Sequence, residues 1–484
     1  MLSSGLAASL RGGLRISPTS PLFLKNSTAA ASRRALPASL IAISLPPCRP
    51  LTSSTKLCAR ISPTSRKSQL PDLKRSHLAA SRSATAEQQR EVEAALLYSH
   101  LAPVPSDVGQ PSIPRALLFL FGFSALSFAG AAYYSLMDTQ HVAAQLRGSR
   151  DVFANISSYF VGSDATQESE VWGAGVTQKQ LMVAKKQESA MRLGLRMQHL
   201  IGWCDQLQLP VGVTEVIGRV YLITAQKYLD LLPSQQVVVP VVAINTLVFG
   251  LWTVASARRG GAMWRWMTTN FVHRPSANRM RTMLTSVFSH QTLLHYVFNN
   301  VALWSIGGSA LMVAAHRSTN SAENIPEASP TPQFLAFFVT AGLFAATVSH
   351  LVAGIRFKRI SLRHGIDVAR ATVGRHASLG SSGAVYSALV MSACAFPDAK
   401  LGIIFLPFVS VPIGVGLAGI VAVDVAGVLF RWKMFDHWAH LGGAAFGALY
   451  WYAGGVDVWR QLKSWLAQSF RLHDDTRQIR YRWQ

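Results

Sequence analysis

Long apolar runs alternate with polar connections over most of the chain. The first run, Ala116–Met137, contains no charged residue. At 1.5 Å per residue, a helix of that length crosses a hydrocarbon core about 30 Å thick. Six more apolar runs follow a long gap: Val237–Ala257, Gln291–Ala315, Phe334–Ile355, Ser382–Pro397, Leu401–Phe430 and His437–Gly455. The pattern predicts an all-α polytopic membrane protein in which one helix precedes a group of six.

Two of these runs depart from a simple span. Ser382–Pro397 is short for a complete crossing, which takes about 20 residues of helix. Leu401–Phe430 is much longer and has a single charge, Asp424, but it also contains Pro407 and Pro412. Because proline disrupts a helix interior, this run predicts an irregular approach and a helix from about Pro412.

The gap between the first and second runs, residues 138–236, carries nine basic and nine acidic residues and is therefore neutral. Its apolar positions recur at intervals of three and four: Val213, Ile217, Val220, Tyr221, Thr224, Tyr228 and Leu231. This spacing is typical of an amphipathic helix, here lying along the membrane surface before the second span. A small soluble helical hairpin fits the same spacing equally well.

The composition agrees with a membrane protein and removes other classes. Of the 484 residues, 50% are hydrophobic and 14% are charged, against about 25% charged in a typical soluble domain. The net charge of +23 could indicate nucleic-acid binding, but the positions of the charges favour targeting and membrane orientation instead, and no nucleic-acid partner is expected. The four cysteines have no paired spacing, so they support neither a disulfide framework nor a zinc site.

Residues 1–100 read as a presequence followed by a disordered basic segment. From Met1 to Pro71 there is no Asp or Glu, whereas the same stretch holds ten Lys and Arg residues among many Ser and Ala residues. An Arg-rich, Ser-rich and acid-free segment is typical of an organellar transit peptide. This composition fits mitochondrial and chloroplast import alike.

Three polar motifs lie inside apolar runs, where an ionisable group is costly and therefore a candidate for function. They are Gly380-Ser381-Ser382-Gly383, His440 in Ala439-His440-Leu441-Gly442-Gly443, and the pair His295 and Asn299. A serine hydroxyl needs a neighbouring imidazole to accept its proton, so Ser382 and His440 are the candidate catalytic pair.

Small residues indicate how the two helices approach each other. Gly443 and Gly447 form a G-x-x-x-G spacing behind His440, and Gly383, Ala384, Ser387 and Ala388 offer a matching face. His295 and Asn299 are four residues apart and share one helix face, from which both could donate hydrogen bonds to a developing oxyanion. No third group is assigned to orient His440, so the expected site is a Ser-His dyad.

Each motif has a plainer interpretation. G-S-S-G alone usually marks a turn or a helix contact, and His295 with Asn299 could hold two helices together. His290, His350 and His437 keep that structural interpretation, and Asp424 is expected to pair with a donor in the interior.

In combination, the motifs resemble those of the rhomboid intramembrane serine proteases, and of their mitochondrial, presenilin-associated-rhomboid-like branch in particular. The resemblance spans roughly Pro233–Tyr452 and is strongest in four stretches: FSHQTLLHYVFNNVALWSI from Phe288, SLGSSGA from Ser378, IIFLP from Ile403 and FDHWAHLGG from Phe435. One departure concerns a Trp-Arg pair that bacterial relatives carry in the first loop. Here the equivalent stretch reads Arg279-Met280-Arg281-Thr282, and no role is carried onto it.

The resemblance implies a six-helix rhomboid core over residues 237–455, an extra transmembrane helix over 116–137, a connecting segment over 138–236 and a C-terminal tail over 456–484. It implies that Ser382 attacks a peptide carbonyl, that His440 acts as base and then acid, and that His295, Asn299 and the Ser382 N–H hold the oxyanion. It implies no metal or organic cofactor. The substrates it implies are single-span inner-membrane proteins in the lipid bilayer, such as a dynamin-like fusion GTPase or a peroxidase precursor.

Two other functions fit parts of the pattern. A catalytically silent rhomboid-like adaptor would bind spans without cutting them, although such proteins usually lack the Ser or the His. A seven-span transporter would also use buried His, Asn and Asp, but it would favour internal repeats, and none is found between the two halves.

The loops of the six-helix group predict an orientation. The first, third and fifth loops are rich in Arg and Lys, whereas the second has Arg317 against Glu323 and Glu327. By the positive-inside rule, the basic loops and the N-terminus lie in the mitochondrial matrix. The C-terminus and residues 138–236 then face the intermembrane space, and the protein is a multi-pass protein of the mitochondrial inner membrane.

Overall fold

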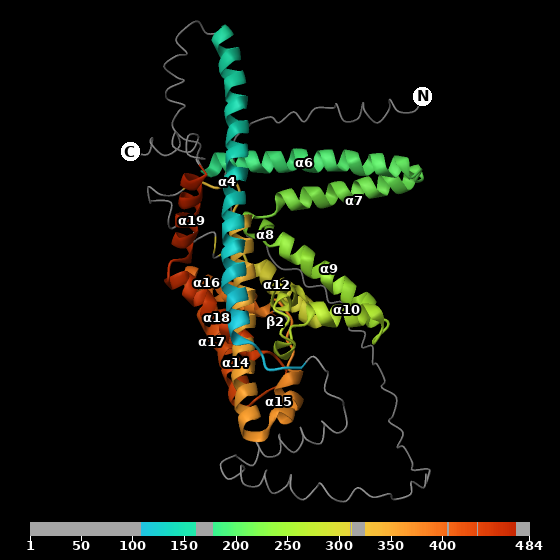
Figure 1. Ribbon diagram of the computed structural model, residues 1–484. Helices are drawn as coiled ribbons and strands as arrows, with labels where there is room; N and C mark the ends of the chain where they lie inside the picture. Colours follow the sequence, from blue (N-terminus) through green and yellow to red (C-terminus); the bar gives the residue numbers. More distant parts are fainter. Residues whose placement is uncertain are drawn as a thin grey trace, which may run out of the picture. The chain divides into compact units, whose positions relative to one another are not determined.

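The computed structural model describes residues 108–160, 178–309, 311, 325–403, 406–432 and 434–470. Each of the seven apolar runs forms a helix (Figure 1). These are α4 (Ile113–Phe160), α9 (Val239–Ser256), α12 (Leu293–Ile306), α14 (Thr331–His364), α16 (Ser382–Ala395), α17 (Ile413–Leu429) and α18 (His437–Tyr452). The predicted presequence, residues 1–100, lies outside the described residues.

Three segments of the described chain are long and apolar enough to cross a bilayer, namely Ile113–Leu146, Pro233–Ser256 and Thr331–His364. Helices α16 and α17 are apolar but shorter. The prediction of an all-α polytopic membrane protein is therefore confirmed.

Local sequence signals set the ends of several helices. The Asp436 carboxylate accepts a hydrogen bond from the Ala439 N–H (3.1 Å) and so caps α18. Pro412 directly precedes α17, as the sequence predicted. The irregular approach to α17 is a β-hairpin, in which β1 (Lys400–Ile403) pairs antiparallel with β2 (Leu406–Pro412), with Lys400 opposite Pro412.

Helices α14, α16 and α18 form the centre of the described fold. Their buried side chains include Phe334, Phe337 and Ala341 of α14, together with Ala384 and Ala388 of α16. A Cβ on Gly443 would lie 2.0 Å from the Gly383 carbonyl oxygen, and one on Gly447 would lie 2.4 Å from the Ser387 carbonyl oxygen. The close approach of α16 and α18 that the G-x-x-x-G spacing predicted is therefore present.

The neutral segment between α4 and α9 contains two long helices, α6 (Gln178–Gln206) and α7 (Val211–Asp230). They lie side by side, and the Tyr221 hydroxyl of α7 donates to the Leu193 carbonyl of α6 (2.9 Å; Figure 1). The two helices form the helical hairpin that the sequence allowed, and a position of α7 along the membrane surface stays a prediction. The short helix α8 (Pro233–Gln236) then leads into α9.

The C-terminal segment is more ordered than a tail. Residues Gly455–Ser469 form helix α19, which packs against α4 through buried Trp459, Leu466 and Ala467. Their spacing of seven and eight residues places them on one helix face, a signal that the sequence already held.

One end of the described fold brings together segments that are far apart in sequence, and we call it the loop end. It comprises residues 108–112, the first loop (257–292), residues 365–381 and the described residues 431, 432 and 434–436. Its short elements are α10 (Ala262–Phe271), η2 (Pro275–Ala277), α11 (Arg281–Thr285), η3 (Ser286–Phe288), α15 (Ile366–Thr372) and η4 (Val373–Arg375).

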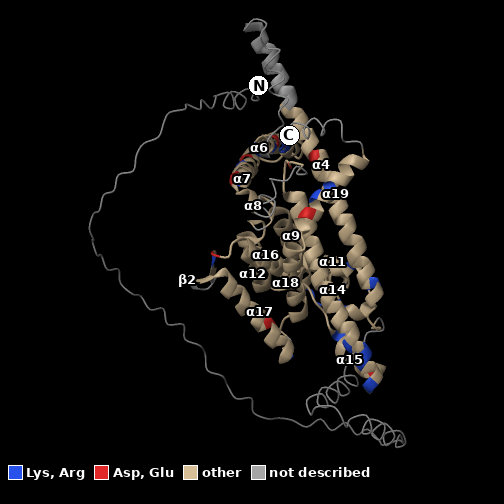
Figure 2. Ribbon diagram, turned by 90° about the vertical axis from the view of Figure 1, so that its left-hand side faces the viewer, with Lys and Arg blue, Asp and Glu red and all other residues tan. Residues whose placement is uncertain are grey.

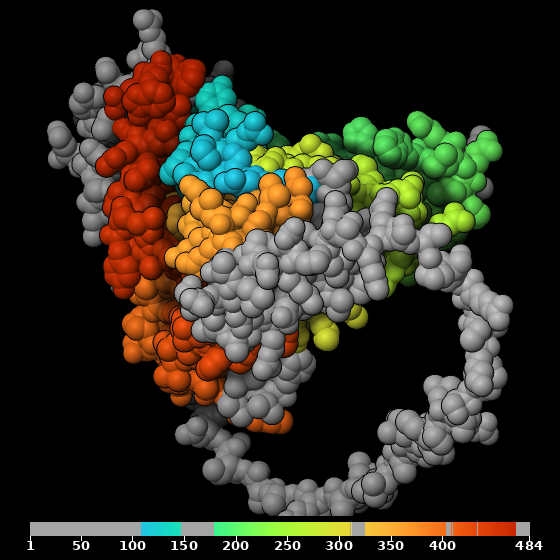
Figure 3. Space-filling view, turned by 60° about the horizontal axis from the view of Figure 1, so that its bottom comes forward, coloured from blue at the N-terminus to red at the C-terminus, as the bar shows by residue number. Residues whose placement is uncertain are grey.

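Hydrogen bonds join these segments. The backbones of His273 and Ser378 exchange two hydrogen bonds of 2.9 Å, Gly109 donates to the Ser276 carbonyl, and the Ser276 hydroxyl donates to the Gly374 carbonyl (2.7 Å). Figure 3 shows the beginning of α4 beside the α14–α15 region at this end.

Residues 138–146, 325–330 and 455–470 meet at the opposite end, which we call the far end. The Ala328 N–H donates to the Thr139 hydroxyl (3.1 Å), and Lys463 donates to the Ile325 carbonyl (3.0 Å). Figure 2 shows basic residues gathered around α15, whereas both charge signs occur around α4, α6 and α19.

Candidate active site

Ser382 and His440 lie in hydrogen-bonding contact, although they are far apart in the chain. Ser382 is the first residue of α16 and His440 lies in the first turn of α18, so the glycine contact between these helices sets their distance. The distance from Ser382 Oγ to His440 Nε2 is 2.8 Å. A hydroxyl that donates to an imidazole nitrogen can lose its proton to it, which is the arrangement of an activated serine nucleophile.

A third residue, Asp424 of α17, contacts the other nitrogen of the same imidazole. The distance from His440 Nδ1 to Asp424 Oδ1 is 2.9 Å. Because Nε2 faces the serine hydroxyl as an acceptor, the neutral ring carries its proton on Nδ1 and donates it to the carboxylate. The sequence analysis assigned no group to orient His440, and here it was incomplete: Asp424 is the expected interior partner, and the donor that it meets is His440.

Asp424 also accepts hydrogen bonds from two neighbours. His437 Nδ1 lies 2.6 Å from Asp424 Oδ1, and the Tyr386 hydroxyl donates to Asp424 Oδ2. The Tyr386 ring also stacks on His440, with centroids 4.7 Å apart and planes inclined by 14°. A Cβ on Gly427 would lie 2.3 Å from the His437 ring, so the glycine allows this ring to reach the carboxylate. The His440 imidazole is therefore held in two ways: the Tyr386 ring stacks on one of its faces, and Asp424 accepts a hydrogen bond from its Nδ1.

Asp424 Oδ1, His437 Nδ1 and His440 Nδ1 could also hold a metal ion by spacing alone, since they lie within 4.8 Å of one another. A ring nitrogen that carries a proton has no lone pair for a metal. Metal binding would therefore require His440 to give up its hydrogen bond to Asp424.

His295 and Asn299 lie beside the residues that precede Ser382. Gly380 has φ +124°, and a Cβ there would lie 2.6 Å from His295 Nε2, so the imidazole packs against the glycine backbone. The Asn299 oxygen accepts from the Ser381 hydroxyl (3.3 Å), while its Nδ2 donates to the His295 carbonyl (2.9 Å). The fold brings both side chains to the Gly380–Ser382 turn, and one amide N–H of Asn299 is already used within α12.

The residue before the nucleophile is fixed from two sides. The Ser381 hydroxyl also lies 3.2 Å from His290 Nε2, and the same nitrogen accepts from the Ser381 N–H (3.4 Å). His290 therefore supports the turn that carries Ser382, in keeping with the structural interpretation given to it. The N–H groups of Ser382 and Gly383 stand in the first turn of α16, where no helical carbonyl is available to them.

Comparison with known proteins agrees with this arrangement. Residues 277–455 match the family model described as the rhomboid domain. The chain contains a rhomboid domain. All four candidate residues, and Asp424, lie within it.

Three curated relatives, all named mitochondrial, align with about half of this chain. The chain is 33% identical to the presenilin-associated rhomboid-like protein A, mitochondrial, of Danio rerio over 47% of this chain and 50% of the relative. It is 34% identical to the human presenilin-associated rhomboid-like protein, mitochondrial, over 48% and 52%. It is 30% identical to rhomboid protein 1, mitochondrial, of Saccharomyces cerevisiae over 45% and 53%.

The chain thus spans about half the length of the curated relatives it matches. No solved structure gives a significant match. The sequence motifs resembled those of mitochondrial rhomboid proteins of the presenilin-associated-rhomboid-like type. The comparisons confirm this resemblance for the rhomboid domain.

Proposed function

We propose that this protein is an intramembrane serine endopeptidase. The observation that carries the proposal is the 2.8 Å contact between Ser382 Oγ and His440 Nε2 at the start of a short apolar helix. Ser382 attacks the carbonyl carbon of a peptide bond while His440 takes the hydroxyl proton. His440 then gives that proton to the leaving amine, which leaves an acyl group on Ser382. In the second half of the reaction, water attacks this acyl group while His440 takes a proton from the water, and His440 then returns the proton to the Ser382 oxygen. Asp424 holds the base in the tautomer that this transfer needs.

The oxyanion that forms in each step needs donors near Ser382 Oγ. The Ser382 N–H, the His295 imidazole and the second N–H of Asn299 are the proposed donors, since all three stand at the Gly380–Ser382 turn. Loss of one donor costs about 10²–10³ in kcat in a well-studied serine protease. We expect roughly ten- to a thousandfold for Asn299→Ala and at least as much for His295→Ala.

Asn300 supplies a matched control for Asn299. It is the next residue on α12, and its side-chain oxygen accepts from Asn245 (3.0 Å), so it joins α12 to α9. Asn300→Ala should lower the unfolding temperature with little effect on kcat, whereas Asn299→Ala should lower kcat at a near-normal unfolding temperature. The reverse pattern would remove Asn299 from the oxyanion site.

The decisive test of the activity uses Ser382→Ala and His440→Ala in the full chain. Each should reduce turnover of a single-span membrane substrate at least about a thousandfold. Ser382→Ala should also abolish labelling by a fluorophosphonate probe. The best experiment compares the N-termini of membrane proteins in cells that carry the wild-type chain or Ser382→Ala. An unchanged set of N-termini, together with an unlabelled wild-type serine, would instead support a catalytically silent rhomboid-like adaptor.

The proposed location is the mitochondrial inner membrane, because the relatives are named mitochondrial and the chain is a polytopic membrane protein. We propose that the loop end, which collects the basic first loop and residues 356–375, faces the matrix, since an excess of Lys and Arg favours that side. The active site would then open near the matrix face, and the far end would face the intermembrane space.

Protease protection tests this orientation. After rupture of the outer membrane, a tag after residue 484 should be digested, while a tag in the first loop should be protected. A C-terminal tag that survives the protease would invert the proposed topology.

A further inference from the structure

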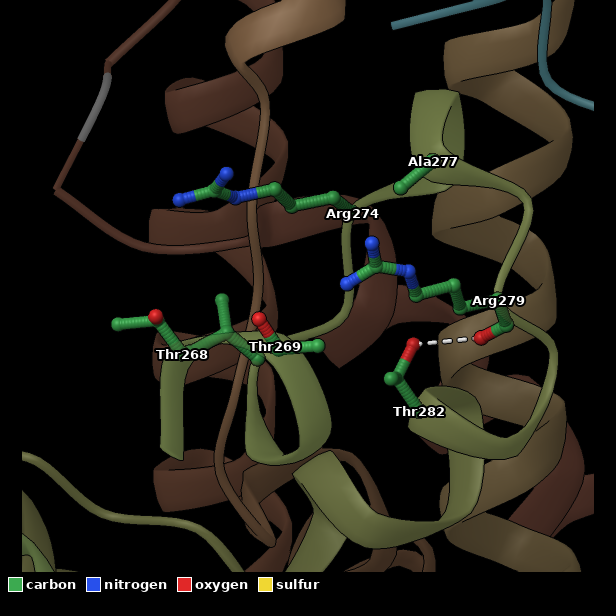
Figure 4. Close-up of a pocket in the computed structure, with 7 residues that line it drawn as sticks. Thr268, Thr269, Arg274, Ala277, Arg279 and Thr282 are labelled. Atoms are coloured by element: carbon green, nitrogen blue, oxygen red, sulfur yellow. Dashed lines mark hydrogen bonds between the residues drawn. The ribbon is translucent and has the colours of Figure 1, made fainter. Parts of the chain in front are cut away.

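The first loop contains a small polar cavity that is separate from the Ser382–His440 pair. It lies between the end of α10 and the η2–α11 segment and has a volume of about 80 Å³. Arg274, Arg279, Thr268, Thr269 and Thr282 contribute to its wall. In Figure 4, both guanidinium groups extend over the cavity toward the turn that carries Thr268 and Thr269. One ordered water needs about 10–15 Å³ of such space, so the cavity has room for a small polyatomic group.

The first loop, which forms this cavity, carries charge of one sign only. The first loop carries six arginines, and the chain has no Asp or Glu from residue 231 to residue 322. Arg274 and Arg279 are both half-buried. Within the part of the chain that the structure describes, the Arg274 guanidinium has neither a hydrogen bond nor an ion pair. A half-buried cation without a counter-charge is costly, and an anion bound in the cavity would offset that cost.

The threonines differ in what they can offer to a ligand. The Thr282 hydroxyl donates to the Arg279 carbonyl (2.7 Å), and the Thr268 hydroxyl donates to the Trp264 carbonyl (3.0 Å), so both protons are used. The Thr269 hydroxyl has no hydrogen-bond partner among the described residues and remains available as a donor. The cavity thus presents two planar guanidinium forks and one hydroxyl, which suit the oxygens of a tetrahedral oxyanion.

We propose that this cavity binds a phosphate group, either that of an anionic phospholipid or free phosphate. The lipid source is the expected one, because α10 also exposes Trp266, whose ring lies 5.5 Å from that of Phe271. Exposed tryptophan is enriched where a protein meets the headgroup layer, and basic pockets of membrane proteins bind phosphate headgroups.

Binding here would affect the position of the turn before the nucleophile. Arg274 follows His273 directly, and the His273 backbone forms the two-bond bridge to Ser378, four residues before Ser382. A ligand that holds Arg274 therefore also holds this bridge. The proposal itself concerns binding, and its test needs no turnover, so it stands or falls independently of the protease assignment.

The test measures the unfolding temperature of the purified full chain in a zwitterionic detergent. Phosphatidylcholine is the reference, and phosphatidylglycerol, cardiolipin or inorganic phosphate is added in parallel. A ligand at a hundred times its Kd should raise the unfolding temperature by about 3–5 °C. We expect this rise with the anionic lipids. The same rise with inorganic phosphate alone would support the site with free phosphate as its ligand.

Two double variants with equal loss of charge separate the cavity from general electrostatics. The double variant Arg274→Gln with Arg279→Gln should lose the rise in unfolding temperature. The control is Arg258→Gln with Arg265→Gln, which alters two exposed arginines of the same loop that lie outside the cavity wall, and it should keep the rise. Should the first pair not fold, Arg274→Lys with Arg279→Lys keeps the charge but removes the forks, and it should need at least tenfold more lipid for the same shift. Equal shifts in all variants, or no shift in the wild-type chain, would overturn the proposal.

Discussion

Two carboxylates at different places in the fold, Glu327 and Asp424, have different kinds of partner. At the far end, Glu327 accepts from Lys463 (2.8 Å) and from the Trp459 indole (2.6 Å), and the Lys463 side chain is only 2% exposed. In the active site, Asp424 accepts from two imidazoles and a phenol, and its side chain is 3% exposed. Glu327 has an ammonium group, that of Lys463, as its counter-charge. Asp424 instead meets rings that can gain and lose protons, as a reaction cycle requires.

A related contrast distinguishes the basic residues of the two ends. At the far end, Lys185 lies 2.5 Å from Asp138 and 2.9 Å from Glu188, so its charge is balanced inside the protein. At the loop end, the six arginines of the first loop face no acidic residue from their own segment. Charge that is balanced internally contributes to folding, whereas a guanidinium such as that of Arg274, which has no partner among the described residues, is available to a membrane or a ligand.

The largest effect is expected where the carboxylate faces the base. Asp424→Asn can present an N–H to His440 Nδ1, which would favour the tautomer whose Nε2 cannot accept the serine proton. A fall in kcat of about 10²–10⁴ should follow, with little change in KM.

The control for Asp424 is Tyr386→Phe, which keeps the carboxylate and removes one of its donors; it should retain most of the turnover. Fluorophosphonate labelling should slow in parallel with kcat in Asp424→Asn. Turnover within threefold of wild type in Asp424→Asn would reduce this residue to a structural role.

The next effect is on stability at the far end. Glu327→Gln leaves the buried Lys463 without its counter-charge, and removal of one partner of a buried pair costs about 3–5 kcal/mol. Burial lowers the pKa of Lys463 and Glu327 opposes that shift, so the lysine should also lose its proton more easily in the variant. Denaturant unfolding in mild detergent measures the loss.

A surface pair on the helix that carries Lys463 gives the control for Glu327. Asp457 pairs with Arg460 at 2.9 Å, but its side chain is 65% exposed. Asp457→Asn should therefore change stability by less than about 1 kcal/mol. Equal losses from Glu327→Gln and Asp457→Asn would show that burial does not distinguish the two pairs.

A smaller loss is expected from the helix contact that sets the Ser382–His440 distance. Gly443→Ala places a methyl group against the Gly383 carbonyl and should cost about 1–3 kcal/mol. A displacement of about 1 Å at the reacting groups can reduce turnover by about a hundredfold. Gly419→Ala on α17, where a Cβ meets no atom within 4 Å, should leave both quantities unchanged. Normal turnover in Gly443→Ala would mean that the two helices can separate without harm to the site.

The smallest effect concerns a buried histidine of the loop end. The pKa of His273 lies at about 3, because burial and the neighbouring His350 lower it more than Asp436 raises it. The unfolded chain binds this proton near pH 6.5, so the stability from the neutral ring is complete above that pH and is lost as the pH falls toward 3.

Between pH 6.5 and 5, the free energy of unfolding should fall by up to about 1.4 kcal/mol per pH unit through this residue. His273→Gln should flatten the dependence, whereas His199→Gln on the exposed face of α6 should not. Identical slopes in all three proteins would exclude His273 as the source.

Much of this architecture could be predicted because apolar length and small-residue spacing act locally. The seven apolar runs, the start of α17 at Pro412 and the contact through Gly443 all follow from such patterns. The role of Asp424 could not be derived in this way, because its contact with His440 depends on how α17 lies against α18. A single carboxylate in a long apolar run was nevertheless a signal.

Periodicity could not reveal that α6 and α7 pack against each other as a hairpin, because it does not identify a packing partner. The Tyr221–Leu193 hydrogen bond supplies that information. The helix over Gly455–Ser469 was missed although its buried Trp459 and Leu466 are regularly spaced, because no apolar run marks it.

The position of His440 on α18 also bears on biogenesis. The nucleophile lies on α16 and Asp424 on α17, so a nascent or partly imported chain that ends before α18 holds a serine without its base. If Ser382 and His440 act as proposed, such a chain should be inert until α18, the last helix within residues 277–455, completes the site. Under the proposed function, competence to cut would therefore coincide with completion of membrane insertion, and a partly inserted chain would not cut neighbouring membrane proteins.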